Sequence, residues 1–270
     1  RDGRDALYNR CGIHFYRDYC DSMFEVPGKE MVEELLQKGI ADDERPENGA
    51  VVVKIDEKLG LKEEKYRVMV VLRSDGTALY ATEDLALARQ KFLDYPDLQK
   101  SFYVVDVRQS LHFQQVFKTL ELAGYEWATR CQHLPYELVN LPGNVVMASR
   151  EGTVVLLEDL IREATDRALT VVQEKNRELS AEKQLEIARA VGIGAIRFPM
   201  LARESNKVVT FDWESALDFN GQAAPYIQYS YVRANSIMRK IGDRIPPDLA
   251  PTYELTQPEI TLVDLISRMP

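Results

Sequence analysis

The amino-acid sequence predicts an α/β protein in which a half of alternating strands and helices precedes a mainly helical half. Three observations lead to this prediction. Short β-branched runs alternate with segments of helical spacing up to about residue 150. A strand–helix–strand–helix order is typical of a parallel sheet covered by helices. Beyond that point the apolar residues recur only at helical spacing, which places the boundary between about 150 and 220.

Composition limits the classes of protein to consider. The 270 residues are 45% hydrophobic and 29% charged, enough for a sizeable core. A net charge of −9 argues against nucleic-acid binding driven by overall charge, although a local basic surface stays open. Three cysteines without CxxC spacing and only three histidines predict reduced thiols and no metal site. No apolar run of about 18 residues and no signal peptide is found, so we predict a cytoplasmic protein without a membrane segment.

The first half contains the predicted strands. Residues 1–48 mix short apolar pieces with charge and end in a solvated loop. The β-branched runs GAVVVKI (49–55) and YRVMVVL (66–72) predict two strands, and an SDG turn leads to a third at 77–81, which forms a hairpin. The run SFYVVDV (101–107) predicts a buried strand.

Helices follow these strands. Ala81, Leu85, Ala88 and Phe92 fall at helical spacing, and a second helix is predicted from Ser110, a capping residue, to Gly124. In the second half, apolar stripes predict helices at 157–176 and 181–190. Pro225 begins a further helix that reaches Lys240, and several prolines then precede a last amphipathic piece.

Two pairs of polar residues stand where predicted strands give way to helices. Tyr80 and Asp84 are four residues apart, so they share one helix face, and a phenol beside a carboxylate suits a cationic ligand. The spacing alone favours the structural alternative, in which Asp84 complements the helix dipole and Tyr80 covers the core. Gln109 is either a polar reader of a small ligand or a helix-start residue facing water. His112 adjoins Phe113, which predicts a hydrogen-bonded, semi-buried histidine rather than a general base. Adjacent ends of parallel strands that offer polar side chains predict a pocket.

The stretch NVVMASREGT (144–153) is a candidate phosphate loop. Arg150 would clamp a phosphate, Ser149 and Thr153 would donate hydrogen bonds, and Gly152 would let backbone amides approach. The alternative is a Ser/Gly turn with a solvated arginine. His133 leads into this segment and can equally be structural.

The Tyr-rich segment after Pro225 allows two interpretations. A stripe of Tyr226, Tyr229 and Arg233 fits a helix packed on a core with its arginine exposed. Alternatively, three basic side chains contact an RNA backbone: Arg233, Arg239 and Lys240. A dinucleotide-binding oxidoreductase has little support, because no GxGxxG follows a predicted strand; the nearest match, Gly192-Ile193-Gly194-Ala195, lies in the helical half.

Five segments, taken in order, resemble the arginyl-tRNA synthetase family of class I aminoacyl-tRNA synthetases. They are DGTALYATEDLALA, YVVDVRQSLHFQQVFKTLELAGY, HLPYELVNLPGNVVMASREGTVVLLEDLI, VGIGAIRF and FDWESALDFNGQAAPYIQYSYVRANSI. The resemblance runs from about residue 50 to 240 and implies a Rossmann-like catalytic domain followed by an α-helical anticodon-binding domain. Residues 1–190 would then form part of the catalytic domain with connecting helices, and residues 191–270 a helical region leading into a truncated anticodon-binding domain.

The resemblance also implies an activity. The family joins arginine to ATP, with Mg²⁺, to give arginyl-adenylate and pyrophosphate, and then transfers arginine to tRNA(Arg). Tyr80, Asp84 and Gln109 match residues that hold the arginine side chain, and His112 matches a position next to that pocket. The resemblance implies an ATP site formed by the signature loop together with His133, whose members are Met147, Ser149, Arg150, Gly152 and His133. Within this site, Ser149 and Arg150 would be the catalytic residues.

Two departures from the family pattern bear on activity. The His-x-Gly-His signature is absent, since Gly12-Ile13-His14-Phe15 does not match it, so we expect a fragment that is inactive alone. The signature loop has no lysine, and Glu151 stands beside Arg150. The alternative hypothesis is therefore a catalytically decayed synthetase-derived protein that binds RNA or protein. An intact upstream signature would favour the enzyme.

Overall fold

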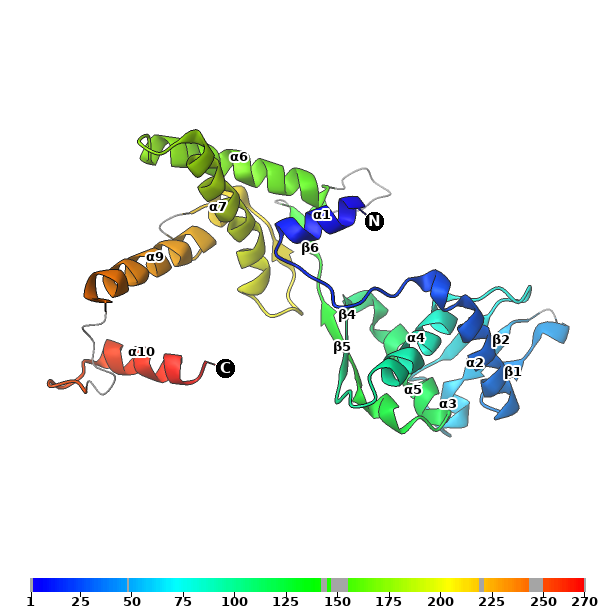
Figure 1. Ribbon diagram of the computed structural model, residues 1–270. Helices are drawn as coiled ribbons and strands as arrows, with labels where there is room; N and C mark the ends of the chain where they lie inside the picture. Colours follow the sequence, from blue (N-terminus) through cyan, green and yellow to red (C-terminus); the bar gives the residue numbers. More distant parts are fainter. Residues whose placement is uncertain are drawn as a thin grey trace.

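The computed structural model divides into two lobes and a pair of outlying helices (Figure 1). The chain is described at residues 2–47, 49–141, 145–146, 155–218, 221–242 and 250–269. Two stretches of chain, at residues 11–20 and 137–138, run between the first lobe and the second. Among the described residues, no helix has both the length and the apolar character that crossing a membrane requires.

The first lobe begins with an antiparallel sheet. Its strands are β1 (Asp42–Asp43), β2 (Val51–Lys54) and β3 (Val68–Leu72), in the order β1-β2-β3. β-branched residues dominate β2 and β3, as their pleated, half-buried position favours. Short helical segments flank the strands: η1 (Asp21–Met23), α2 (Glu25–Gln37), η2 (Arg45–Glu47) and α3 (Ile55–Lys58).

A parallel strand pair completes this lobe. β4 (Ser101–Asp106) and β5 (Cys131–Tyr136) run parallel, with Tyr103 opposite His133. Between them the chain forms η3 (Val107–Gln109), α5 (Ser110–Leu122) and η4 (Glu126–Arg130). Helix α4 (Tyr80–Asp94) precedes β4. One apolar core joins these elements, and its fully buried side chains include Leu85, Val116 and Leu120.

The second lobe is built around two long helices, α6 (Leu157–Lys175) and α7 (Ala181–Leu201). Helix α1 (Asp2–Arg10) lies beside them although it is distant in sequence, because Cys11 packs with Ile161 and Ala195 (Figure 1). A small sheet, β7 (Val145–Val146), β6 (Val139–Leu141) and β8 (Val209–Thr210), adjoins this core together with α8 (Trp213–Ala216). β6 pairs with β8 in parallel and with β7 antiparallel.

The chain closes with two exposed helices. Helix α9 (Ala224–Ile241) contacts α7 through its first residues, where Gln228 donates a hydrogen bond of 3.0 Å to the carbonyl of Ala190. Helix α10 (Gln257–Ser267) begins with a capping box formed by Thr256 and Glu259. The predicted division of the chain at residue 190 falls inside α7 and stays a prediction.

Several predicted elements differ from the structure. No third strand forms at 77–81: Ala78 makes only an isolated bridge to Leu72, and α4 already begins at Tyr80. The two early strands are antiparallel, so only β4 and β5 in this lobe follow the predicted parallel arrangement. Residues 1–48 contain α1 and α2, whose alternating charges masked their helical spacing. The second long helix runs on to Leu201, through Pro199 in its last turn.

Candidate functional site

Helix α4 begins at the candidate site through a buried threonine. The Thr82 hydroxyl accepts a hydrogen bond of 3.2 Å from the backbone N–H of Leu79 and donates one to the carbonyl of Val71. The first bond satisfies an unpaired donor at the helix N-terminus. The second ties α4 to β3, and Thr82 is fully buried. This one side chain therefore sets where the helix starts, and with it the position of Asp84.

Replacing Thr82 by valine tests this anchor. The change keeps the shape of the side chain but leaves a buried carbonyl and a helix N–H without their partner. We expect the free energy of unfolding to fall by about 1–3 kcal/mol. Urea unfolding followed by circular dichroism measures it, with Thr170→Val as the control, because Thr170 is exposed and bonds only within its own helix. An equal effect of both changes would refute the anchoring role.

The structure brings Asp84 and His112 together. Asp84 comes from the second turn of α4 and His112 from the first turn of α5, and His112 Nε2 lies 2.6 Å from Asp84 Oδ2. Both side chains are about 25% exposed. The other oxygen, Oδ1, makes no hydrogen bond with any described residue. A carboxylate half-satisfied in this way at the surface of a lobe can accept a hydrogen bond from a cation.

Tyr80 and Gln109 lie on the same two chain segments as this pair but make no hydrogen bond to it. Tyr80 is 77% exposed on the first turn of α4, and Gln109 is exposed at the end of η3. The turn before Gln109 is held by Asp106, which accepts hydrogen bonds from the backbone and side chain of Arg108. Those bonds lower the pKa of Asp106 to about 2. The expectation of two adjacent parallel strand ends is wrong, because β3 pairs antiparallel with β2 and with no strand of the parallel pair among the described residues.

An aromatic layer lies behind the Asp84–His112 pair. The His112 ring meets Phe113 edge-on at 5.0 Å, and Phe113 packs against Tyr103 at 5.2 Å and against His133 at 5.1 Å. His133 Nε2 is 3.0 Å from the carbonyl oxygen of Val105. The His133 ring therefore packs between β5 and α5. This is the structural alternative given for His133 in the sequence.

A lysine reaches this layer from α4. Lys91 Nζ lies 3.9 Å from the centroid of the Tyr103 ring, a cation–π contact. No carboxylate of the described residues pairs with it, and burial lowers the pKa of its ammonium group. Burial also raises the pKa of the neighbouring Cys131 thiol to about 11. Lys91 and Thr82 are not among the residues predicted for the site, although Lys91 follows Asp84 by seven residues, a spacing that returns to the same helix face.

Carboxylates surround the site. The pKa of Glu83 is raised, first by burial and then by the nearby charges of Asp21, Asp84 and Glu25. The carboxylate charges that act on Glu83 favour the arrival of a cation, since its charge relieves their repulsion. The electrostatics of this region therefore agree with the preference for a cationic ligand that Tyr80 and Asp84 suggested.

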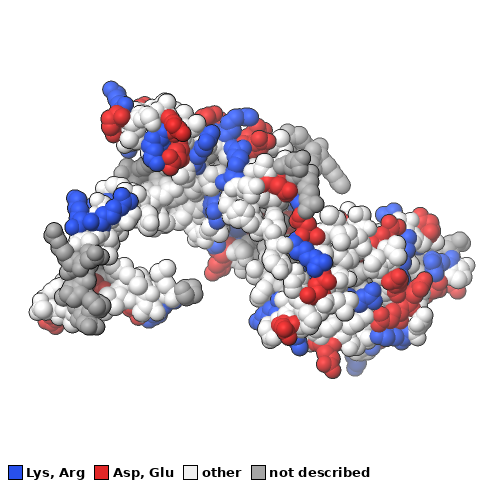
Figure 2. All heavy atoms as spheres, in the orientation of Figure 1, with Lys and Arg blue, Asp and Glu red and all other residues white. Residues whose placement is uncertain are grey.

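The remaining predicted site residues fall elsewhere. The signature-loop residues Met147, Ser149, Arg150, Gly152 and Thr153 lie outside the described residues. The three basic residues of α9 are all exposed: Arg233, Arg239 and Lys240. Arg233 stacks over Tyr229 at 5.7 Å, and α9 contains no acidic residue. Figure 2 shows Lys and Arg gathered over this helix.

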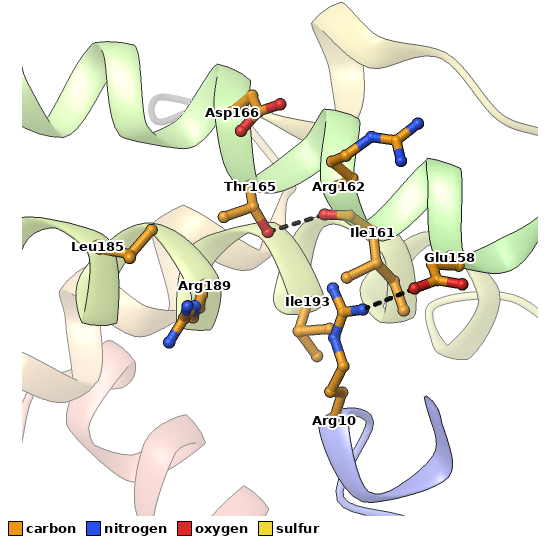
Figure 3. A pocket seen from close by; sticks show the side chains of 9 residues that line it. All are labelled: Arg10, Glu158, Ile161, Arg162, Thr165, Asp166, Leu185, Arg189 and Ile193. Atoms are coloured by element: carbon orange, nitrogen blue, oxygen red, sulfur yellow. Dashed lines mark hydrogen bonds and ion pairs between the residues drawn. The ribbon is translucent and has the colours of Figure 1, made fainter. Parts of the chain in front are cut away.

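A cavity of about 710 Å³ lies away from these residues, between α1, α6 and α7 (Figure 3). Arg10 reaches across it toward Glu158, at 3.8 Å. Ile161 and Ile193 form part of its apolar wall, and none of the predicted site residues lines it. Within the described residues no group of three or more His, Cys, Asp or Glu side chains is placed to hold a metal ion.

The chain resembles known proteins in both sequence and structure. Residues 3–213 match the family described as tRNA synthetases class I (R), catalytic domain. The arginine–tRNA ligase of Clostridium perfringens is 42% identical over 242 residues, which are 89% of this chain and 40% of that relative. The arginine–tRNA ligase of Clostridium acetobutylicum is 39% identical over 239 residues, again 40% of its length. The chain thus spans about 40% of the length of the curated relatives it matches.

Solved structures show the same likeness. The arginyl-tRNA synthetase of Thermus thermophilus aligns with a TM-score of 0.78 at 30% identity, over 98% of this chain and 48% of that one. The arginyl-tRNA synthetase of Plasmodium falciparum aligns with a TM-score of 0.68 at 22% identity, over 88% of this chain and 38% of that one. At that identity the second match supports the fold alone.

Proposed function

Because this chain belongs to the arginyl-tRNA synthetase family of class I, we propose that it carries the arginine-binding part of an arginine–tRNA ligase. The whole protein would join arginine to ATP and then pass the arginyl group to tRNA(Arg). The observation that carries the proposal is the Asp84 carboxylate, held by His112 through Oδ2 and unbonded at Oδ1, in acidic surroundings. A guanidinium needs such an acceptor, and the relatives are named for the same amino acid.

The arginine site comprises Tyr80, Asp84, Gln109 and His112. Asp84 supplies the charge that offsets the guanidinium, while Gln109 and the Tyr80 hydroxyl offer neutral acceptors around it. The side chain of the amino acid is thereby fixed, so that its carboxylate is presented to ATP. Positioning of this kind is the main way in which an enzyme accelerates phosphoryl chemistry without a protein nucleophile.

Activation proceeds by in-line displacement. A carboxylate oxygen of arginine forms a bond to the α-phosphorus of ATP, the bond from that phosphorus to the bridging oxygen breaks, and pyrophosphate leaves. Positive charge placed on the departing phosphates lowers the barrier. Mg²⁺ would accompany ATP, and we assign it no protein ligand. The signature loop with Met147, Ser149, Arg150 and Gly152 would close over the phosphates, with His133 at its approach.

Arginine-dependent exchange of pyrophosphate into ATP tests this function. The complete protein, with saturating arginine and tRNA(Arg), should catalyse exchange that stops when arginine is left out. Absence of exchange would refute the ligase and leave the non-catalytic, synthetase-derived binding protein, which the named relatives do not favour.

Arg150→Ala tests the loop. With no lysine beside it, Arg150 is the loop's one basic side chain, so we expect adenylate formation to slow about 100-fold, as when one transition-state donor is removed. The affinity for arginine should hardly change, because the loss is confined to the transition state. Single-turnover kinetics with labelled ATP give the rate, and Arg150→Lys, which keeps the charge, is the matched control. An unchanged rate would show that the loop's cation is not used.

We also propose that α9 contacts tRNA(Arg) through Arg233, Arg239 and Lys240. All three are exposed, and no acidic residue lies on the same helix. Such contacts address the phosphate backbone and therefore weaken as salt rises. Residues 191–270 would lead into the anticodon-binding domain, and the proposed location is the cytoplasm.

A further inference from the structure

We propose that His112 is a positioning residue, which fixes the Asp84 carboxylate for the guanidinium and does not itself contact arginine. The inference rests on the proposed function. His112 Nε2 donates its hydrogen to Asp84 Oδ2 at 2.6 Å, a short, charge-assisted bond. That bond fixes the orientation of the carboxylate, and Oδ1 has no hydrogen-bond partner among the described residues.

The imidazole packs against the aromatic layer of the core. Its ring meets Phe113 edge-on at 5.0 Å with the planes at 76°. Phe113 is only 4% exposed and packs against Tyr103 and His133, so the layer reaches from α5 to both strands of the parallel pair. A donor anchored in this way transfers the rigidity of the core to Asp84.

Charges of both signs lie near Asp84. Glu83 precedes it, and the charges of Asp21, Asp84 and Glu25 raise the pKa of Glu83. Lys91, two turns further along α4, places its ammonium group over the Tyr103 ring and interacts with Asp84 through space only, since no ion pair joins the two. Among the described residues, His112 is the hydrogen-bond partner of Asp84. Without it, repulsion from Glu83 would favour rotamers that turn the carboxylate toward water.

The arrangement also restricts how the guanidinium is held. The bond from His112 uses one of the two acceptor sites on Oδ2, so Asp84 keeps the second site on Oδ2 and both sites on Oδ1 for the guanidinium. The remaining guanidinium hydrogens need further acceptors, and the exposed side chains of Tyr80 and Gln109 are the neutral ones proposed for this site. His112 thus acts on the ligand through the geometry of Asp84.

A double-mutant cycle tests the proposal. On the complete protein, in arginine-dependent ATP–pyrophosphate exchange with tRNA(Arg) present, His112→Ala should raise the KM for arginine about tenfold, the loss of one charge-assisted hydrogen bond. The KM for ATP should stay the same. In an Asp84→Ala background the same substitution should have no further effect, since residues that act through one another are not additive. Full additivity would overturn the proposal.

Conservative variants separate positioning from folding. His112→Gln places an amide nitrogen near the position of Nε2, so its KM for arginine should lie within about threefold of the wild-type value. Gln114→Ala, an exposed change on the same helix, is the control and should leave the KM unaltered. Thermal unfolding shows whether each variant is folded. A folded His112→Gln as impaired as His112→Ala would contradict donation from this position.

The same data distinguish the two proposals. If Asp84→Ala weakens arginine binding but the cycle is additive, only the role of His112 is overturned. If Asp84→Ala leaves arginine binding intact, the arginine site itself is misplaced and the proposed function is refuted with it.

Discussion

Asp84→Ala should raise the KM for arginine by about 100-fold or more while leaving the KM for ATP nearly unchanged. Removing one partner of a desolvated ion pair costs about 3–5 kcal/mol, and the quarter exposure of Asp84 places the expected loss near the lower figure. A loss of about 3 kcal/mol corresponds to roughly 100-fold in affinity. Arginine-dependent pyrophosphate exchange at varied arginine and ATP gives both constants.

The neighbouring carboxylate supplies a matched control. Glu83→Gln removes the same charge one residue earlier on α4, but Glu83 makes no hydrogen bond to His112. We expect its effect on the KM for arginine to be a few-fold at most, as for a charge that acts only through space. Equal losses for arginine and ATP in Asp84→Ala would mean that Asp84 is structural, and equal losses in the two variants would mean that the site responds only to total charge.

Substitution of Gly192 should destabilise the second lobe. A Cβ at this position of α7 would lie 2.9 Å from the backbone nitrogen of Thr165 and 3.0 Å from the carbonyl carbon of Ala164, both in α6. Backbone atoms cannot turn aside as a side chain can, so the helices must separate. Overpacking of this kind costs about 1–3 kcal/mol, which exceeds the gain of about 1 kcal/mol in helix propensity. For Gly192→Val we expect a loss of stability near the upper end of this range, measured as the free energy of unfolding in urea.

Gly194 on the same helix is the matched control. Its Cβ would meet the side-chain nitrogen of Gln228 at 2.9 Å and Ala224 Cβ at 3.1 Å. The Gln228 side chain can move, so Gly194→Ala should cost less than about 1 kcal/mol. If Gly192→Ala is as mild as Gly194→Ala, the close approach of α6 and α7 at Gly192 is not required for stability.

These two glycines explain the one glycine pattern that the sequence offered as a nucleotide motif. Gly192-Ile193-Gly194-Ala195 follows no strand and opens no helix; it lies in the interior of α7. A dinucleotide loop needs glycine so that its backbone can approach a phosphate. Here glycine is needed at position 192 so that one helix backbone can approach another. The pattern is therefore a packing feature of the second lobe.

The sequence predicted most of the elements because each depends on local spacing. The apolar residues that recur at helical spacing from Leu157 predicted α6, and the β-branched runs predicted β2 and β3. A few residues suffice for this, because apolar residues repeat at a different spacing in helices and in strands. The predicted strand at 77–81 was wrong because α4 begins at Tyr80, inside that segment. The hydrogen bond from Thr82 to Val71 of β3, eleven residues away, fixes the start of this helix. Local propensity contains no information about such a partner.

For the candidate site, too, some features were predictable from the sequence and others depended on the tertiary structure. Residue types and spacing suggested a cationic ligand for Tyr80 and Asp84, and the resemblance added Gln109 and His112 to that predicted site. The order of five segments determined the family. Only the tertiary structure decided that Asp84 and His112 are hydrogen-bonded while Tyr80 and Gln109 stand apart from them. These two residues are 28 positions apart, and the packing of α4 against α5 over a shared aromatic layer sets their distance. A hydrogen bond depends on tenths of an ångström, which side-chain packing fixes and sequence spacing does not.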